Sequence, residues 1–310
     1  MCVIGKSKAS RNNKAEAKTM DYIEIPNSGY IVQHLADGSR VLLAEPVDFI
    51  LIRTLQELQA PVIEMWALWR RSVGDVTLLK ELSHLKRLHV INRTTDQIGG
   101  LAELKQLQAL SIETGRKFDV DVRSWPVLED LLFFWSGKFT GLADARSLRR
   151  LSIWRWREPD LQRLIEAPQL RELTLVKGGL RTLSGIEACT GLEALALSHL
   201  TRLDDFHDIG KLRRLRSLSI DTCRNVREID WVSSLSNLES LYLYNIGNVN
   251  SLAPVKTLGT LKRLHFGGST NVLDGNSIIV KELGLSEYGF TNRKHYNYTY
   301  DHVGGPIENL

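Results

Sequence analysis

The stretch Leu170-Arg-Glu-Leu173-Thr-Leu175 carries a pattern, Leu-x-x-Leu-x-Leu, that recurs along most of this 310-residue chain. Clear copies follow one another at intervals of 20 to 23 residues and start at Leu85, Leu107, Leu128, Leu148, Leu170, Leu192, Leu215, Leu238 and Leu261. A degenerate first copy precedes them at Ile63, Trp66 and Leu68. A fixed period of this length predicts a solenoid, because each unit can bury its apolar face only against its neighbours.

Two kinds of apolar spacing alternate along the chain. The last two apolar residues of a copy, such as Leu173 and Leu175, are two apart, which is the spacing of a strand with one buried face. The residues before each copy keep a spacing of three, as in Leu203, Phe206, Ile209, Leu212, Leu215 and Leu218. A step of three fits a 3₁₀ or irregular turn better than a regular α-helix. We therefore expect an α/β solenoid with a parallel sheet and return arms of 3₁₀ or short helical segments.

These repeats resemble the leucine-rich repeat, in the short class found in internalins and in a regulatory subunit of protein phosphatase 1. The resemblance covers residues 61–270, about ten repeats. It implies a horseshoe with the parallel sheet on the concave side and the 3₁₀ or irregular segments on the convex side. The family usually places Asn or Cys three residues after the last strand apolar, and here only Cys223 matches. The equivalent positions hold Arg93, Gly115, Ser136, Trp156, Gly178, Leu200, Ile246 and Ser269.

The segments outside the repeats differ from them in composition and in the spacing of apolar residues. Residues 1–20 are Lys-rich and polar, which predicts a disordered basic tail. Residues 21–60 predict an N-terminal cap, with an Asp-Gly hairpin turn followed by helical spacing over residues 48–59. The spacing of three stops after Phe266, so residues 271–310 are expected to form a C-terminal cap followed by a loose tail.

Composition places the chain among folded soluble proteins. Apolar residues make up 43% and charged residues 25%, and the formal net charge is +4. So small a positive charge argues against nucleic acid as the partner. The three cysteines form no CxxC pair, no secretory segment follows Met1, and no apolar run is long enough to span a membrane. We expect a monomeric cytoplasmic protein with no cofactor and no membrane partner.

Residues between and just beyond the strand apolars should point out of the concave face. Several of them are large aromatics or arginines, the residue types that dominate binding hot spots. The predicted partner-binding residues are Trp69, Arg87, Leu132, Phe134, Arg150, Trp154, Arg155, Tyr242 and Tyr244. A structural alternative is that Phe134 and Trp154 stack on each other across adjacent strands.

The sequence predicts neither a catalytic nor a metal site. Ser, His and Asp residues are scattered, and no nucleophile and base fall at converging positions. Asp204-Asp-Phe-His-Asp208 holds metal-ligand types, but the spacing of three turns Phe206 inward and leaves the charges on the solvated side. We therefore expect a non-catalytic protein-protein interaction scaffold: an adaptor, an enzyme regulator or an inhibitor of a toxin. The alternative function is recognition of a glycan or of single-stranded nucleic acid by aromatic and arginine side chains.

Overall fold

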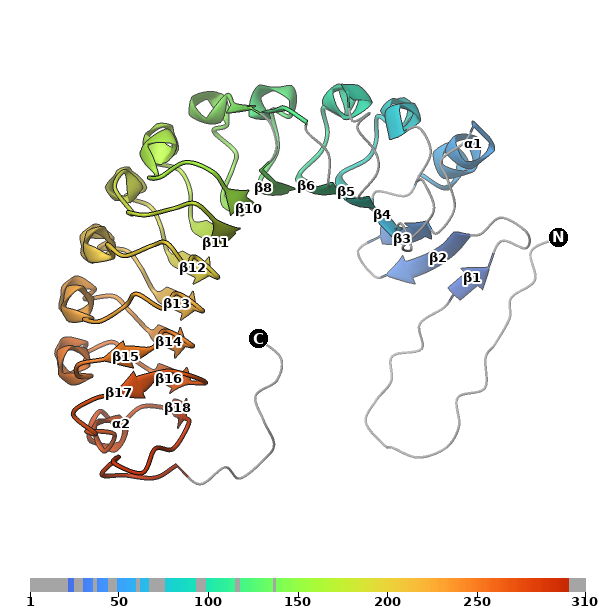
Figure 1. Cartoon of the computed structure of the whole chain (residues 1–310). Coiled ribbons are helices and arrows are strands. Elements are labelled where there is room, and N and C mark those ends of the chain that lie inside the picture. Colours follow the sequence, from blue (N-terminus) through green and yellow to red (C-terminus); the bar gives the residue numbers. More distant parts are fainter. Residues whose placement is uncertain are drawn as a thin grey trace, which may run out of the picture. The chain divides into compact units, whose positions relative to one another are not determined.

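The computed structural model describes residues 22–24, 30–35, 38–43, 49–59, 62–66, 76–92, 99–114, 118–135 and 138–300. The chain divides into two compact units, Met1–Leu148 and Arg149–Leu310. Both units consist of mostly parallel strands joined by arms that contain 3₁₀ helices (Figure 1). This is the arrangement that the two alternating apolar spacings predict.

The first unit combines an antiparallel start with a parallel continuation. Its strands are β1 (Tyr22–Glu24), β2 (Tyr30–Leu35), β3 (Gly38–Leu43), β4 (Val62–Trp66), β5 (Arg87–Asn92), β6 (Ala109–Thr114) and β8 (Asp130–Phe134). β1, β2 and β3 pair antiparallel, whereas β3, β4, β5, β6 and β8 pair parallel in chain order. The connecting arms hold the short strand pair β7 (Val120–Asp121) and β9 (Phe139–Thr140), with the 3₁₀ helices η1 (Val76–Glu81), η2 (Gly99–Glu103), η3 (Val122–Ser124) and η4 (Leu142–Asp144).

The N-terminal part of this unit contains a hairpin and a helix, as its sequence suggests. β2 and β3 form the antiparallel hairpin, and α1 spans Phe49–Leu58. Ile52 and Leu55 on α1 are buried, and Gln56 Nε2 donates a hydrogen bond to the Glu81 carbonyl at 3.2 Å. The helix thus packs beside η1 (Figure 1). That these elements cap the solenoid stays a prediction, and the predicted basic tail lies outside the described residues.

The first repeat has a different frame from the one its sequence suggests. Strand pairing sets Ile63 opposite Leu88, so Ile63 takes the second leucine position of the pattern. The predicted frame of Ile63, Trp66 and Leu68 is therefore wrong by three residues. The reason is a longer interval, because 25 residues separate Ile63 from Leu88. Trp69, which the predicted frame placed on the concave face, lies outside the described residues.

The strands of the second unit pair in parallel and in chain order. They are β10 (Arg150–Trp156), β11 (Glu172–Gly178), β12 (Ala194–Ser198), β13 (Ser217–Asp221), β14 (Ser240–Tyr244), β16 (Arg263–Gly267) and β18 (Glu287–Phe290). The arms hold the strand pair β15 (Asn248–Val249) and β17 (Asn271–Val272). They also hold η5 (Gln162–Glu166), η6 (Ile186–Ala188), η7 (His207–Lys211), η8 (Asp230–Ser234), η9 (Ala253–Thr257) and α2 (Ile279–Glu282).

Equivalent leucines of neighbouring turns stand directly opposite one another in the sheet. Leu173, Leu195, Leu218 and Leu241 form one such column, and none is more than 2% exposed. A fully buried leucine contributes about 1.5–3 kcal/mol relative to exposure. Because the leucines of both adjacent turns cover each one, a single repeat could not bury its own apolar face.

The repeat pattern continues beyond Phe266, where the sequence suggests that it stops. β18 pairs with β16, with Tyr288 opposite Leu264 and Phe290 opposite Phe266. Leu285-Ser-Glu-Tyr288-Gly-Phe290 is therefore a further copy, 24 residues after the last predicted one. Aromatic residues replace two leucines in it, which hides the copy from a search for the leucine pattern.

The segment after β18 packs over the end of this last turn. Tyr296 is only 7% exposed, and its hydroxyl accepts a hydrogen bond from the Val272 amide at 2.9 Å. The rings of Phe290 and Tyr296 have their centroids 5.9 Å apart. These rings cover the apolar end of the stack, and a C-terminal cap followed by a loose tail stays a prediction for this region. Residues 301–310 lie outside the described residues.

Apolar side chains fill three of the positions that the leucine-rich-repeat resemblance assigns to Asn or Cys. Trp156, Leu200 and Ile246 are fully buried there. Cys223, the residue that matches the family at this position, donates a hydrogen bond from its Sγ to the Leu197 carbonyl of the preceding turn at 3.7 Å. Apolar packing therefore takes the place of a polar side chain at this position in the β10, β12 and β14 turns.

Candidate partner-binding face

In each unit, side chains alternate between the core and the open face of the sheet. On β11, Leu173 and Leu175 are buried, whereas Thr174 and Val176 between and beyond them are partly exposed. The same alternation holds on β8, β10, β12 and β13. We call this open side the sheet face.

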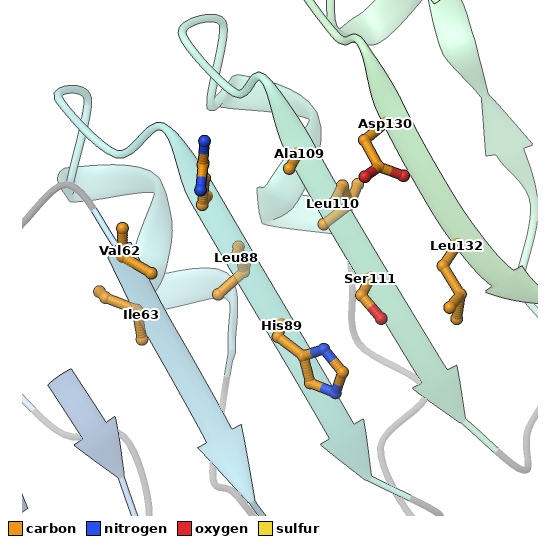
Figure 2. A pocket seen from close by; sticks show the side chains of 10 residues that line it. Val62, Ile63, Leu88, His89, Ala109, Leu110, Ser111, Asp130 and Leu132 are labelled. Carbon is orange, nitrogen blue, oxygen red and sulfur yellow. The ribbon is translucent and has the colours of Figure 1, made fainter. Parts of the chain in front are cut away.

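The sheet face of the first unit has a pocket of about 280 Å³ (Figure 2). Its polar lining comes from Arg87 and His89 on β5, Ser111 on β6 and Asp130 on β8. Figure 2 shows His89, Ser111 and Leu132 in one row across three neighbouring strands. The Ser111 Oγ is buried and has no hydrogen-bond partner among the described residues. Positive, negative and apolar groups thus line one hollow, which suits the mixed side chains of a protein.

Two predicted binding residues of this unit, Arg87 and Leu132, line that pocket. Phe134 is half-buried at the end of β8 and does not line it. Asp130 also lines the pocket, and the predicted binding residues did not include it. The alternation along β8 already places it on the sheet face, which is the signal that could have found it.

The sheet face of the second unit has a floor of small side chains between aromatic walls. Half-buried Trp154 lies on β10, and half-buried Tyr242 and Tyr244 lie on β14. The floor between them consists of Thr174, Ala194, Ala196, Ser217 and Ser219. Neighbouring strands lie about 4.8 Å apart, so the walls on β10 and β14 are roughly 19 Å from each other. Arg150 and Arg155 are exposed on β10.

The Tyr242 ring is held in place by a buried histidine that the sequence did not single out. The rings of Tyr242 and His265 stack with centroids 5.2 Å apart and an interplanar angle of 8°. His265 is 4% exposed, and its Nε2 lies 3.1 Å from Glu287 Oε1. Burial lowers the pKa of His265, and the neighbouring Glu287 carboxylate opposes this shift. Gly289 leaves space for the His265 ring, because a Cβ at position 289 would lie only 3.1 Å from the His265 Nδ1.

Tyr244 is less accessible than its position alone suggests. Burial raises the pKa of its hydroxyl, and the nearby Tyr300 adds to the shift. Tyr300 follows the segment that closes the stack, and its amide donates to Asn292 Oδ1 at 2.8 Å. The chain itself therefore covers part of Tyr244 at the C-terminal end of the sheet face.

A serine and a histidine are in contact on this face, which the sequence did not predict. Ser198 Oγ lies 2.7 Å from His199 Nδ1. A serine nucleophile needs its histidine oriented by a third group behind the ring. Here the carboxylate of Asp221 lies 3.5 Å from Ser198 Oγ instead, and it also accepts hydrogen bonds from Thr222 Oγ1 and Asn245 Nδ2. The arrangement is thus a hydrogen-bonded cluster without the order of a catalytic triad.

The acidic run 204–208 forms local structural contacts. Phe206 is buried and stacks on Trp231, as the spacing of three predicts. Asp205 accepts from the His207 amide at 3.1 Å, and Asp208 forms an ion pair with Lys211 at 2.6 Å. Over the described part of the chain, no group of three or more His, Cys, Asp or Glu side chains is placed to hold a metal ion.

This repeated strand, 3₁₀ arm and leucine column define a leucine-rich-repeat solenoid. Among solved structures, an internalin (InlF) from Listeria monocytogenes is similar, with a TM-score of 0.53 and 15% identity over 80% of this chain and 78% of that one. This match confirms the fold predicted from the repeats. Two further structures are an internalin C2 from Listeria monocytogenes and the functional domain of its InlJ. Internalin C2 gives a TM-score of 0.42 at 16% identity over 68% and 83% of the two chains, and InlJ gives 0.48 at 15% over 76% and 60%.

Sequence comparison adds no family beyond this structural likeness. No protein-family model matches the chain, and no curated protein does. Within the described ranges, no helix has the length and apolar character needed to cross a membrane.

Proposed function

We propose that the chain is a non-catalytic interaction protein that binds a protein partner on its sheet face. The observation that carries the proposal is the pair of aromatic walls on β10 and β14, which flank a floor of small side chains. Trp154, Tyr242 and Tyr244 are partly exposed where water would otherwise cover a sheet. Large apolar rings at such positions are characteristic of binding hot spots.

Rigidity of the aromatic walls supports the proposal. Tyr242 is fixed by its stack on the buried His265 ring, and it therefore loses little side-chain freedom when a partner binds. A partner can approach the strand backbone closely at this floor, because the side chains of Ala196 and Ser219 are short. Preformed surfaces of this kind bind with a smaller entropic penalty than mobile ones.

We propose that the partner is a protein that the chain joins to another component, regulates or inhibits, and that binding takes place in the cytoplasm. Cys189 and Cys223 are free and buried, which is compatible with a reducing compartment. Burial raises the pKa of both thiols to about 11, so neither is suited to be a nucleophile at neutral pH. Fractionation of cells that express a tagged chain tests the compartment, and a secreted or membrane-bound product would contradict it.

Photo-crosslinking within a single turn tests the binding proposal. A photoreactive amino acid is placed at Ser219 on β13 or, as the matched control, at the exposed Asp230 on η8 of the arm that follows. The chain is then irradiated in its native cells, and the covalent products are identified by mass spectrometry. We expect a discrete protein adduct from position 219 and none from position 230. Adducts from position 230 alone, or a nucleic-acid adduct from position 219, would contradict the proposal.

A further inference from the structure

Basic side chains line one rim of the sheet face in the second unit. The residue that follows the last outward position of each strand is Arg155 on the β10 turn, Lys177 on the β11 turn and His199 on the β12 turn. All three are exposed. Arg157 is exposed slightly further along the β10 turn, Arg202 along the β12 turn and Arg224 along the β13 turn. We call these six residues the basic rim.

The backbone holds the first three side chains of the rim in one repeated orientation. Arg155, Lys177 and His199 have φ angles of 64°, 59° and 55°, in the left-handed region. This conformation is sterically unfavourable for an ordinary L-residue relative to the right-handed region. The equivalent residues of the later turns include Asn245 and Gly268, the types that adopt it most easily. The rim therefore has basic residues at positions where the backbone favours glycine.

Three of the rim cations form no ion pair with a described carboxylate. Among the described residues, no ion pair joins Lys177, Arg202 or Arg224 to an acidic side chain. Glu158 pairs instead with Arg163 at 3.1 Å, and Asp221 accepts hydrogen bonds from Thr222 and Asn245. Positive charge thus accumulates over the four neighbouring turns of β10 to β13, a span of about 14 Å at the usual strand spacing.

Apolar groups lie directly beside this charge. Trp154 and Val176 occupy the last outward positions of β10 and β11, and they are paired in register. Both are partly exposed. An indole and an isopropyl group next to lysine and arginine side chains match a ligand that alternates acidic and apolar side chains.

We propose that the basic rim, together with Trp154 and Val176, binds an acidic segment of a partner protein in extended conformation. The inference rests on the proposed function and specifies the chemistry of the partner. Carboxylates of the segment would pair with Lys177 and its neighbours, while its apolar side chains would rest on the indole. An extended chain advances about 3.3 Å per residue, so a segment of about four to six residues covers the four turns.

A protein segment fits these observations better than single-stranded nucleic acid does. Binding of single strands relies on a series of aromatic rings that stack successive bases. Trp154 is the one aromatic side chain beside the rim in the described part of this surface. The net charge of +4 for the whole chain is also small for a protein that must neutralise many phosphates.

Fluorescence anisotropy with the full chain tests the proposal. The probes are a labelled peptide of alternating Glu and Leu, its Gln-Leu and Lys-Leu counterparts, and a labelled oligothymidine. The double variant Lys177→Glu with Arg202→Glu removes charge from the rim. The control variant Arg214→Glu with Lys294→Glu makes the same change of net charge at exposed residues away from the rim. Thermal melts of all chains check that each variant is folded.

We expect the Glu-Leu peptide to bind the native chain, with at least a 10-fold loss in the rim variant and less than about 2-fold in the control. Salt should weaken this binding, because exposed charges are screened. Equal affinity for the Gln-Leu peptide, equal losses in both variants, or binding of oligothymidine alone would overturn the inference. If the peptide fails to bind but position 219 still crosslinks to a protein, the acidic-segment inference is wrong and the proposed function stands. If position 219 gives no protein adduct, the proposed function itself fails.

Discussion

Replacing Leu218 by aspartate should unfold the protein or bring it close to unfolding at neutral pH. Leu218 is fully buried on β13, in register between Leu195 and Leu241. Truncating such a leucine to alanine typically costs about 2–5 kcal/mol, including the cavity that remains. Aspartate adds the penalty of an unpaired buried carboxylate, so the loss should exceed about 5 kcal/mol. That is comparable to the whole stability of a typical domain, about 5–15 kcal/mol.

The neighbouring residue provides the control for this prediction. Ser219 precedes the next buried position on the same strand, but its side chain lies on the sheet face. Ser219→Asp should therefore change the free energy of unfolding by about 0.5 kcal/mol or less. Urea titrations followed by circular dichroism measure both variants, with Leu218→Ala as an intermediate. Similar losses for Leu218→Asp and Ser219→Asp would refute the assignment of alternating core and face positions.

Two further predictions concern the C-terminal end of the stack. Tyr296→Phe leaves the Val272 amide without its 2.9 Å acceptor and should destabilise the protein by about 1–3 kcal/mol in urea titrations, whereas an unchanged midpoint would show that this bond is unimportant. Burial lowers the pKa of His265, so the stability due to its neutral ring is fully present above the unfolded value of about 6.5 and is lost as the pH falls toward the lower folded pKa. Melts at several pH values should show this acid-side loss in the native chain and a smaller one in His265→Phe; identical pH profiles would contradict the assignment.

The middle of the fold could be predicted from the sequence because its repeats are regular. From Leu85 to Phe266, each copy keeps the period-two pair that fixes which side chains enter the core. The first copy was misframed because Ile63 lies 25 residues before its partner Leu88, outside the regular interval. The last copy was missed because aromatic rings replace its leucines. Hydrophobic spacing identifies a repeat only while its interval and residue types persist.

The sheet face was predictable as a set of positions, but its contacts were not. Alternation along the strands places Trp154 and Tyr242 outward without any structure. The stack of Tyr242 on His265 depends on the register between β14 and β16, which no single copy specifies. The basic rim likewise depends on left-handed residues at strand ends, such as Lys177. The three-dimensional arrangement was needed to show that these cations share one rim.

Binding of the crosslinked partner to the double variant Trp154→Ala with Tyr244→Ala is the most direct measurement of what this face does. The account predicts that affinity falls by at least about 100-fold, because two partly exposed aromatic anchors are removed, each worth about 2 kcal/mol as a hot spot. The melting curve should keep a single transition close to that of the native chain. Unchanged affinity in a folded double variant would contradict the claim that the aromatic walls of the sheet face hold the partner.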